Sequence, residues 1–171
     1  LLRVAAGFAA GMAAGLLAGT LTAFSRAADV LLTPLKNIIK ATPVTSFIVL
    51  ILLYFSSNVT PSAVAFLAVL PICWSNVCEG LRQTDKKMTE LAHAYAFGRK
   101  KTLREIYFPA VRPYLSAAAT TGLGFAWKSC VAAEVIALSK NSVGRALYES
   151  KLYLETAELF AWTASVVLIS V

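Results

Sequence analysis

The sequence predicts an all-α protein, a bundle of helices that crosses a membrane several times. Hydrophobic residues make up 58% of the 171 residues, charged residues make up only 15%, and the mean hydropathy is +0.68. Long uncharged runs alternate with shorter loops, and the Lys and Arg residues gather in every second loop. This composition is typical of a polytopic membrane protein and excludes an ordinary soluble domain.

We expect five membrane spans, all within a single domain, 1–171. The first comes from an uncharged run of 22 residues, 4–25, which is long enough to cross about 30 Å of hydrocarbon. The next uncharged run, 41–78, has 38 residues and is too long for one membrane span, so the turn formers at 56–62 divide it. The expected spans are about 4–24, 44–56, 62–81, 114–138 and 159–171.

Small residues recur every four positions in the first expected span, at Gly7, Gly11, Gly15 and Gly19. On a helix this spacing makes a smooth groove that allows another helix to approach closely. We expect the groove to pack within the molecule rather than to form a dimer.

The basic residues orient the spans. Loops 25–43 and 82–112 are cationic, the turn 56–62 is neutral, and segment 139–158 balances its basic residues with acidic ones. The positive-inside rule places the two cationic loops in the cytoplasm. We expect the amphipathic segment 29–43 to lie along the cytoplasmic interface. The net charge of +7 therefore reflects topology, and no stacking platform or base-reading pattern indicates nucleic-acid binding.

The loop 82–112 predicts two short helices joined by a tight turn. An apolar stripe at helical spacing marks the first helix, at Met88, Leu91, Ala92 and Tyr95. Thr84 or Asp85 can cap its start, and Gly98 is placed where a left-handed residue would end it.

The second short helix is expected to begin at Thr102, which forms a capping-box pattern with Glu105. Pro109 is expected to stop or kink it. His93, the only histidine of the chain, is expected to be a surface contact on the first short helix. The two helices together are typical of a docking element. A hairpin that lies on the membrane surface, with its basic residues facing anionic headgroups, is the alternative.

The same loop resembles a known signature. Glu90-Leu91-Ala92, three residues, Ala96, nine residues and then Ile106-Tyr107-Phe108-Pro109 are similar to the EAA-x3-G-x9-I-x-LP motif of bacterial ABC importer permeases. In that family the loop is a pair of cytoplasmic helices that dock in a groove of the ATPase subunit. Ala96 replaces the motif glycine here, and Gly98 is the expected source of the turn instead. The resemblance implies these ATPase-coupling residues: Glu90, Leu91, Ala92, Ala96, Gly98, Ile106, Phe108 and Pro109.

Segments 122–136 and 142–148 resemble the nitrate/sulfonate/taurine (NitT/TauT-type) permeases. The resemblance covers nearly the whole chain and implies a MetI-like type I ABC permease fold in the bacterial cytoplasmic (inner) membrane. It implies import of a small anion delivered by an extracellular or periplasmic binding protein, with cytoplasmic ATPase subunits and a second permease copy as partners. We expect the chain to be an internal piece with five of about six spans. A vitamin precursor such as a pyrimidine is an alternative substrate, and a secondary transporter or channel without an ATPase is an alternative class.

Lys128 and Glu134 are the two charges inside an expected span, and intramembrane charges are candidates for function. Lys128 is a candidate for contact with an anion in the pathway or, alternatively, for an ion pair with Glu79 or a similar charge on a neighbouring helix. Glu134 is a candidate for holding a partner helix or the contact with the binding protein.

Nothing in the sequence indicates catalysis. No phosphate-binding loop and no nucleophile–base–acid set is present, so we expect a transport subunit rather than an enzyme. The three cysteines lack metal-ligand spacing with the histidine and are expected to be packing thiols. We expect no metal and no cofactor.

Overall fold

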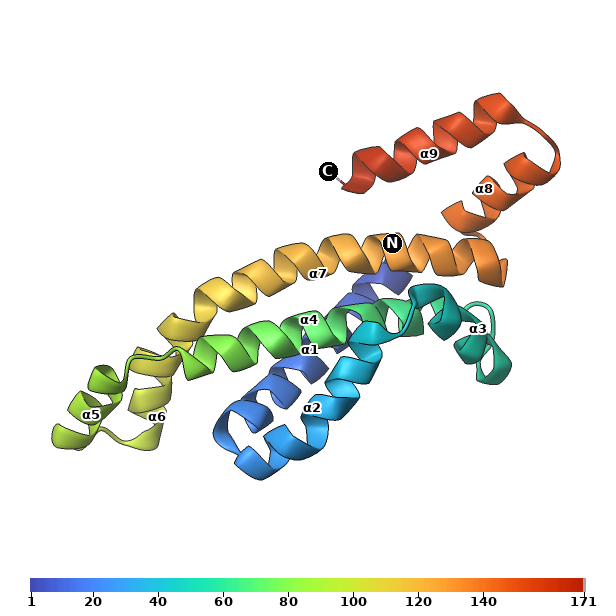
Figure 1. The fold of residues 1–171 in the computed structure, drawn as a ribbon. Helices are drawn as coiled ribbons and strands as arrows, with labels where there is room; N and C mark the ends of the chain where they lie inside the picture. Colours follow the sequence, from blue (N-terminus) through green and yellow to red (C-terminus); the bar gives the residue numbers. More distant parts are fainter. Residues whose placement is uncertain (171) are drawn as a thin grey trace.

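The computed structural model describes residues 1–170, apart from the side chain of His93, and it is helical throughout (Figure 1). Position 171, the last of the expected span 159–171, and the expected contact of His93 lie outside the described residues. No strand occurs within residues 1–170, so the all-α prediction is confirmed. The elements are α1 (Leu2–Phe24), α2 (Arg26–Ala41), α3 (Val44–Tyr54), α4 (Thr60–Arg82), α5 (Lys86–Ala94), α6 (Arg99–Thr102), the π-helical turn η1 (Leu103–Tyr107), α7 (Phe108–Ala137), α8 (Val143–Leu152) and α9 (Thr156–Ser170).

Helices α1 and α4 pack side by side and run in the same direction. The four evenly spaced glycines of α1 are all buried, and each lies against α4. A Cβ atom at Gly15 would lie 2.6 Å from Cys73 Cβ, and one at Gly19 would lie 2.8 Å from Val77 Cβ. Because carbon atoms do not approach so closely, only glycine allows this packing. The expectation that the groove packs within the molecule is confirmed.

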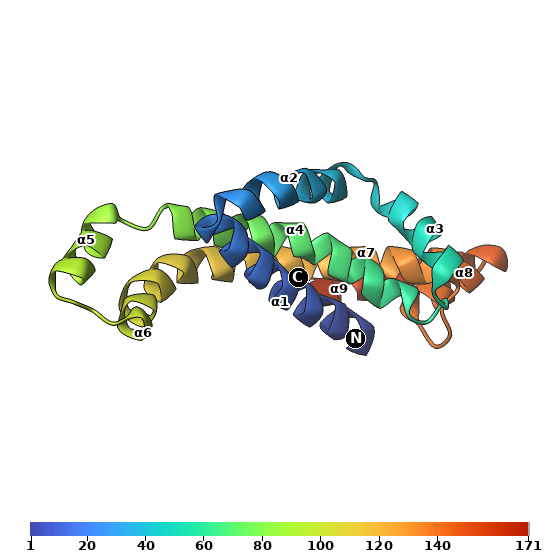
Figure 2. The same ribbon diagram turned by 90° about the horizontal axis from the view of Figure 1, so that it is seen from below.

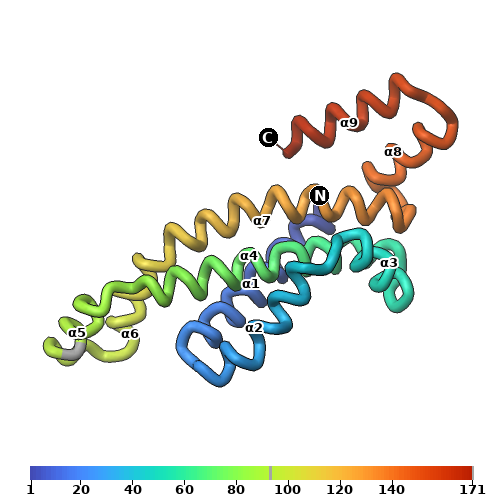
Figure 3. The backbone as a smooth tube through the Cα atoms, viewed as in Figure 1, coloured from blue at the N-terminus to red at the C-terminus, as the bar shows by residue number. Residues whose placement is uncertain are grey.

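Helix α7 packs antiparallel against another face of α4. At one end a Cβ atom at Gly80 would lie 2.8 Å from the ring of Tyr114. Near the middle Val69 contacts α7 at Gly122, and at the far end the Ser139 hydroxyl donates a hydrogen bond of 2.5 Å to the Ser57 carbonyl. The predicted span 114–138 thus lies within a helix of 30 residues. The α8–α9 hairpin turns back along α7, and Figure 3 shows α9 as the outermost helix of the chain.

Two groups of loops lie at opposite ends of this bundle. The α5–α6 hairpin projects beyond one end of α4 and α7, whereas α3 and α8 lie at the other end (Figure 2). The predicted cytoplasmic loop 82–112 and the neutral turn 56–62 are therefore separated by the whole length of α4. By length and composition, α1 and α4 are each able to cross a membrane, and α2 with α3 adds a third if the bent pair is one span.

The path of α2 differs from the expected segment along the membrane interface. Helix α2 stands along α4, because Asp29 pairs with Arg82 at 2.6 Å and the Lys36 ammonium lies 5.6 Å from the centre of the Trp74 ring. Helix α3 has only 11 residues, about 16 Å of helix, and it is bent by 102° from α2. If this bent pair is one span, α2 and α3 share it, whereas the sequence assigns the second span to 44–56 alone.

The amphipathic pattern of α2 is present, but its polar stripe faces inward. Asp29 and Lys36 are half-buried against α4, whereas Val30, Leu31 and Ile38 are exposed. Arg82 and Trp74 draw the polar stripe toward the bundle, since an ion pair and a cation–π contact are both available there. Such an inverted pattern suits a helix whose outer face lies in lipid, where apolar side chains need no cover.

Candidate functional site

The α5–α6 hairpin is the element that the sequence predicts to dock, and its first helix begins as expected. The side chain of Asp85 accepts a hydrogen bond of 2.8 Å from the Lys87 backbone N–H. Helix α5 starts at Lys86, so Asp85 occupies the N-cap position. Of the two candidate caps, the structure selects Asp85, while the Thr84 hydroxyl bonds back to the Gly80 carbonyl at 3.3 Å.

The turn of the hairpin is made by Ala96, the residue at the position of the motif glycine. Ala96 has a left-handed φ of 49°, whereas Gly98 has an extended conformation with φ −65° and ψ 154°. The Phe97 N–H donates to the Ala92 carbonyl at 2.8 Å, the bond that closes a Schellman motif around a left-handed C′ residue. The expectation that Gly98 supplies the turn is therefore wrong, because this bond fixes the left-handed position two residues earlier.

The second arm also begins earlier than predicted. Helix α6 starts at Arg99 after Gly98, and the Thr102 hydroxyl bonds to the Gly98 carbonyl at 3.3 Å rather than capping a helix. The predicted capping box of Thr102 and Glu105 is therefore wrong: Thr102 already has helical angles, φ −59° and ψ −43°.

Pro109 does not stop the second arm. The backbone widens into the π-helical turn η1, in which the Phe108 N–H bonds to the Leu103 carbonyl, and α7 follows without a break. Every residue from Arg99 to Ala137 is helical. A π-helical turn is a known way to absorb a local distortion within a longer helix. The second arm is therefore continuous with α7, whereas the first arm joins α4 through the non-helical stretch 83–85.

The apolar stripe of α5 divides into an outer and an inner part. The outer part is Met88, Leu91 and Tyr95, which are 54%, 50% and 70% exposed. Ala92 is only 4% exposed and lines a small cavity of about 70 Å³ inside the hairpin, together with Phe97 and other residues of the second arm. The other predicted coupling residues are exposed or half-buried on the hairpin: Glu90, Ala96, Gly98, Ile106, Phe108 and Pro109.

One aromatic pair connects the hairpin to α1, a contact that the sequence does not reveal. The ring of Tyr107 lies edge-on to the ring of Phe24, with 5.3 Å between their centres. The two residues are far apart in the chain, and only the parallel packing of α1 on α4 brings the end of α1 to this level. Near them, Arg82 also bonds to the Thr22 carbonyl at 3.3 Å.

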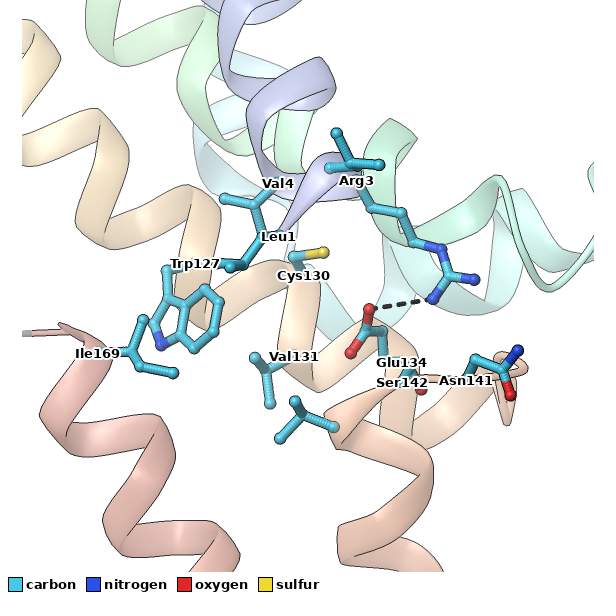
Figure 4. A pocket seen from close by; sticks show the side chains of 12 residues that line it. Leu1, Arg3, Val4, Trp127, Cys130, Val131, Glu134, Asn141, Ser142 and Ile169 are labelled. Atoms are coloured by element: carbon cyan, nitrogen blue, oxygen red, sulfur yellow. Dashed lines mark hydrogen bonds and ion pairs between the residues drawn. The ribbon is translucent and has the colours of Figure 1, made fainter.

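At the opposite end of the bundle, Glu134 holds other helices together. It is 8% exposed, and its carboxylate forms an ion pair of 3.2 Å with Arg3 of α1 (Figure 4). Its second oxygen accepts a bond of 3.3 Å from the Gly144 N–H at the start of α8. Arg3 and Glu134 also line a cavity of about 490 Å³ beside Trp127. Glu134 thus joins three helices, and Arg3 is its partner.

Lys128 is exposed on α7. The alternative of an ion pair with Glu79 is wrong, because the contact of Tyr114 with Gly80 fixes the register of the two helices. Lys128 is 14 residues beyond Tyr114, about 21 Å further along α7. Among the described residues, no three His, Cys, Asp or Glu side chains gather as metal ligands.

These features define an integral membrane helix bundle with a stiff, exposed hairpin at one end. Residues 11–171 match the family model of the binding-protein-dependent transport system inner membrane component. The chain belongs to this family of ABC transporter permeases.

Several named permeases are similar to this chain, among them the following two. The chain is 27% identical over 163 residues to the putative aliphatic sulfonates transport permease protein SsuC of Bacillus subtilis (strain 168). This alignment covers 94% of this chain and 58% of that protein. It is 24% identical over 161 residues to a probable ABC transporter permease protein of Brucella melitensis biotype 1, which covers 94% of this chain and 65% of the relative. The chain thus spans about three fifths of the length of the curated relatives it matches.

Proposed function

We propose that this chain is the transmembrane permease subunit of an ATP-driven importer in the bacterial cytoplasmic membrane. Together with a second permease copy it forms the pathway for a small anion that an extracellular or periplasmic binding protein delivers. Two cytoplasmic ATPase subunits dock on the α5–α6 hairpins and drive transport. The observation that carries the proposal is the exposed apolar stripe of α5, held on an arm that continues into α7.

The stripe supports docking on a protein. Met88, Leu91 and Tyr95 are all at least half exposed on one face of a short helix. Aromatic, Met and Leu side chains at i, i+3 and i+7 are the anchors by which an amphipathic helix binds in a groove. Glu90 lies exposed beside them and can accept charge-assisted hydrogen bonds from a basic residue of the ATPase.

The helical continuity of the second arm supports coupling. A rigid-body movement of the ATPase has to reach the spans through a stiff element. The path from Arg99 to Ala137 is helical at every residue, so a displacement of the hairpin moves α7 with it. Lys128 lies on this helix, and an exposed lysine within a span favours passage of an anion over that of a cation. The name of the Bacillus relative, an aliphatic sulfonate permease, supports a small organic anion as the substrate.

Reconstitution with the ATPase and the binding protein in proteoliposomes tests the proposal. We expect Glu90→Lys and Leu91→Asp to leave the permease inserted but to abolish substrate-stimulated ATP hydrolysis and transport. Lys151→Asp, a comparable change at an exposed residue of α8 at the other end of the bundle, is the matched control and retains both. Transport that persists in Glu90→Lys and without ATP would instead identify a secondary transporter and overturn the proposal.

A further inference from the structure

A second candidate site lies at the bend between α2 and α3. A groove of about 270 Å³ opens there against α4 and α7, and we call it the midspan groove. Its walls are mostly apolar, and its lining includes Lys40, Phe47, Leu67, Pro71, Thr121 and Phe125. The volume is close to the lower end of the range found for small-molecule pockets.

The groove lies near the middle of α4. Pro71 is the twelfth of the 23 residues of α4, so it is about 17 Å from either end of that helix. Lys40 lines the groove at this depth. The sequence places Lys40 in a cytoplasmic loop. In the structure the ion pair of Asp29 with Arg82 holds the start of α2 at one end of α4, and Lys40 lies about 16 Å from Asp29 along the bundle.

A second lysine lies next to the groove on α7. Thr121 and Phe125 of α7 line the groove, and Lys128 follows them at i+7 and i+3. Residues at this spacing share one face of a helix, so Lys128 continues the α7 wall one turn toward the α8 end. Lys128 is exposed, which agrees with a solvent-accessible face of α7 next to the groove.

Neither lysine has its charge compensated within the described residues. The ion pairs there involve Arg3, Arg82, Arg104 and Arg145, and the lysine–aromatic contacts involve Lys36 and Lys101. An ammonium group at the depth of a span is costly in lipid and is found facing protein, water or a counter-charge. Lys40 in the lining of the groove, with Lys128 next to the lining residues of α7 on the same helix face, therefore favours an anion at this place.

We propose that the midspan groove binds a small organic anion within the permease, with its anionic group between Lys40 and Lys128. Its apolar part lies against Phe47, Leu67 and Phe125. The apolar walls favour an aliphatic anion over an inorganic one, since burial of methylene groups strengthens binding only when the ligand carries them. The inference rests on the proposed function, because it places a substrate contact on the pathway.

Binding of an alkanesulfonate series tests the groove directly. The full-length permease with its ATPase, in nanodiscs of zwitterionic lipid and without the binding protein, is titrated with ethanesulfonate, 1-butanesulfonate and inorganic sulfate by calorimetry. We expect 1-butanesulfonate to bind about tenfold more tightly than ethanesulfonate, because two further methylenes are buried. We expect sulfate to bind more weakly than either sulfonate, and the cation butyltrimethylammonium not to bind.

Variants connect this binding to the two lysines. We expect Lys40→Gln and Lys128→Gln each to weaken 1-butanesulfonate binding at least tenfold, and Lys40→Arg and Lys128→Arg to retain most of it. Phe125→Ala reduces the difference between the two sulfonates while leaving ethanesulfonate binding nearly unchanged. Lys151→Gln, at an exposed lysine on α8 away from the groove, binds as the unmodified chain does.

The outcomes separate this inference from the proposed function. If Lys40→Gln and Lys128→Gln bind 1-butanesulfonate as tightly as the unmodified chain does, or if binding does not depend on chain length, the groove is not the site and the inference is overturned. Loss of binding when anionic lipid replaces zwitterionic lipid identifies a lipid headgroup as the occupant and overturns it as well. Glu90→Lys is expected to leave sulfonate binding intact while abolishing transport. If instead Glu90→Lys transports normally, the docking proposal fails. The sulfonate titrations then test the groove independently of it.

Discussion

The ring of Tyr107 meets the ring of Phe24 edge-on, with an angle of 79° between the ring planes. Tyr107 also lines the small cavity of the hairpin that contains Ala92. One side chain therefore closes the docking hairpin and contacts the end of α1. A movement of the hairpin reaches α7 through a continuous helix and reaches α1 through this aromatic pair.

Tyr107→Ala is expected to weaken coupling. The substitution removes the contact with Phe24, which is worth about 1 kcal/mol beyond the area it buries, and it enlarges the cavity beside Ala92. We expect transport per ATP hydrolysed to fall several-fold in proteoliposomes, while the ATPase subunits remain bound. Tyr107→Phe keeps the ring and should transport normally. An unchanged ratio of transport to hydrolysis in Tyr107→Ala would show that α1 does not need this contact.

Ala96→Gly is expected to stabilise the hairpin. Ala96 holds a left-handed φ of 49°, which costs a residue with a Cβ atom roughly 1–2 kcal/mol. Glycine removes this cost but loses more backbone conformational entropy on folding, so the hairpin is stabilised by about 0.5–1 kcal/mol net. Hydrogen exchange of the α5 amides should slow accordingly. Ala94→Gly, at the exposed last residue of α5, is the control and should speed the exchange.

Ala92→Trp is expected to open the hairpin even in the absence of the ATPase. Ala92 is 4% exposed, and the cavity beside it holds about 70 Å³, far too little for an indole ring. The α5 amides of the permease alone should then exchange rapidly, and docking is lost as a consequence. Glu90→Lys, on the outer surface, should leave the exchange of the same amides unchanged. Protected α5 amides in Ala92→Trp would mean that the ring finds room outside the hairpin.

The sequence predicts much of the hairpin, because its signals are local. The cap at Asp85 and the stripe of Met88, Leu91 and Tyr95 depend on residues within a few positions of each other. The turn was harder to predict. Glycine is the residue best suited to a left-handed angle, yet the hydrogen bond from Phe97 to the Ala92 carbonyl decides which residue takes it.

The orientation of α2 could not be predicted from its pattern alone. An amphipathic stripe shows that a helix has two faces, but in a membrane the apolar face points outward as readily as inward. Arg82 and Trp74 of α4 provide the partners that turn Asp29 and Lys36 inward, and they lie 53 and 38 residues further along the chain than these two. For the same reason the charge of Lys40 predicts a loop residue, whereas in the structure Lys40 lines the groove beside the middle of α4.

Arg3→Ala is expected to destabilise the end of the bundle opposite the hairpin. The carboxylate of Glu134 is 8% exposed, and without Arg3 it would remain buried with only the Gly144 N–H as a partner. Removing one partner of a buried ion pair costs about 3 kcal/mol or more. Arg3→Lys keeps the charge and should lose less.

Cys130 reports this change, because it is 1% exposed and lies one helical turn from Glu134. Its labelling by a maleimide in detergent should accelerate in Arg3→Ala, whereas labelling of Cys73, buried against α1, should change less. The matched control is Arg145→Ala, which removes the half-exposed pair of 2.7 Å with Glu149. Such a pair contributes about 0.3–0.5 kcal/mol, so labelling of Cys130 should stay near the rate of the unmodified chain. Equal labelling rates in Arg3→Ala and Arg145→Ala would show that the Arg3–Glu134 pair does not stabilise this end of the bundle.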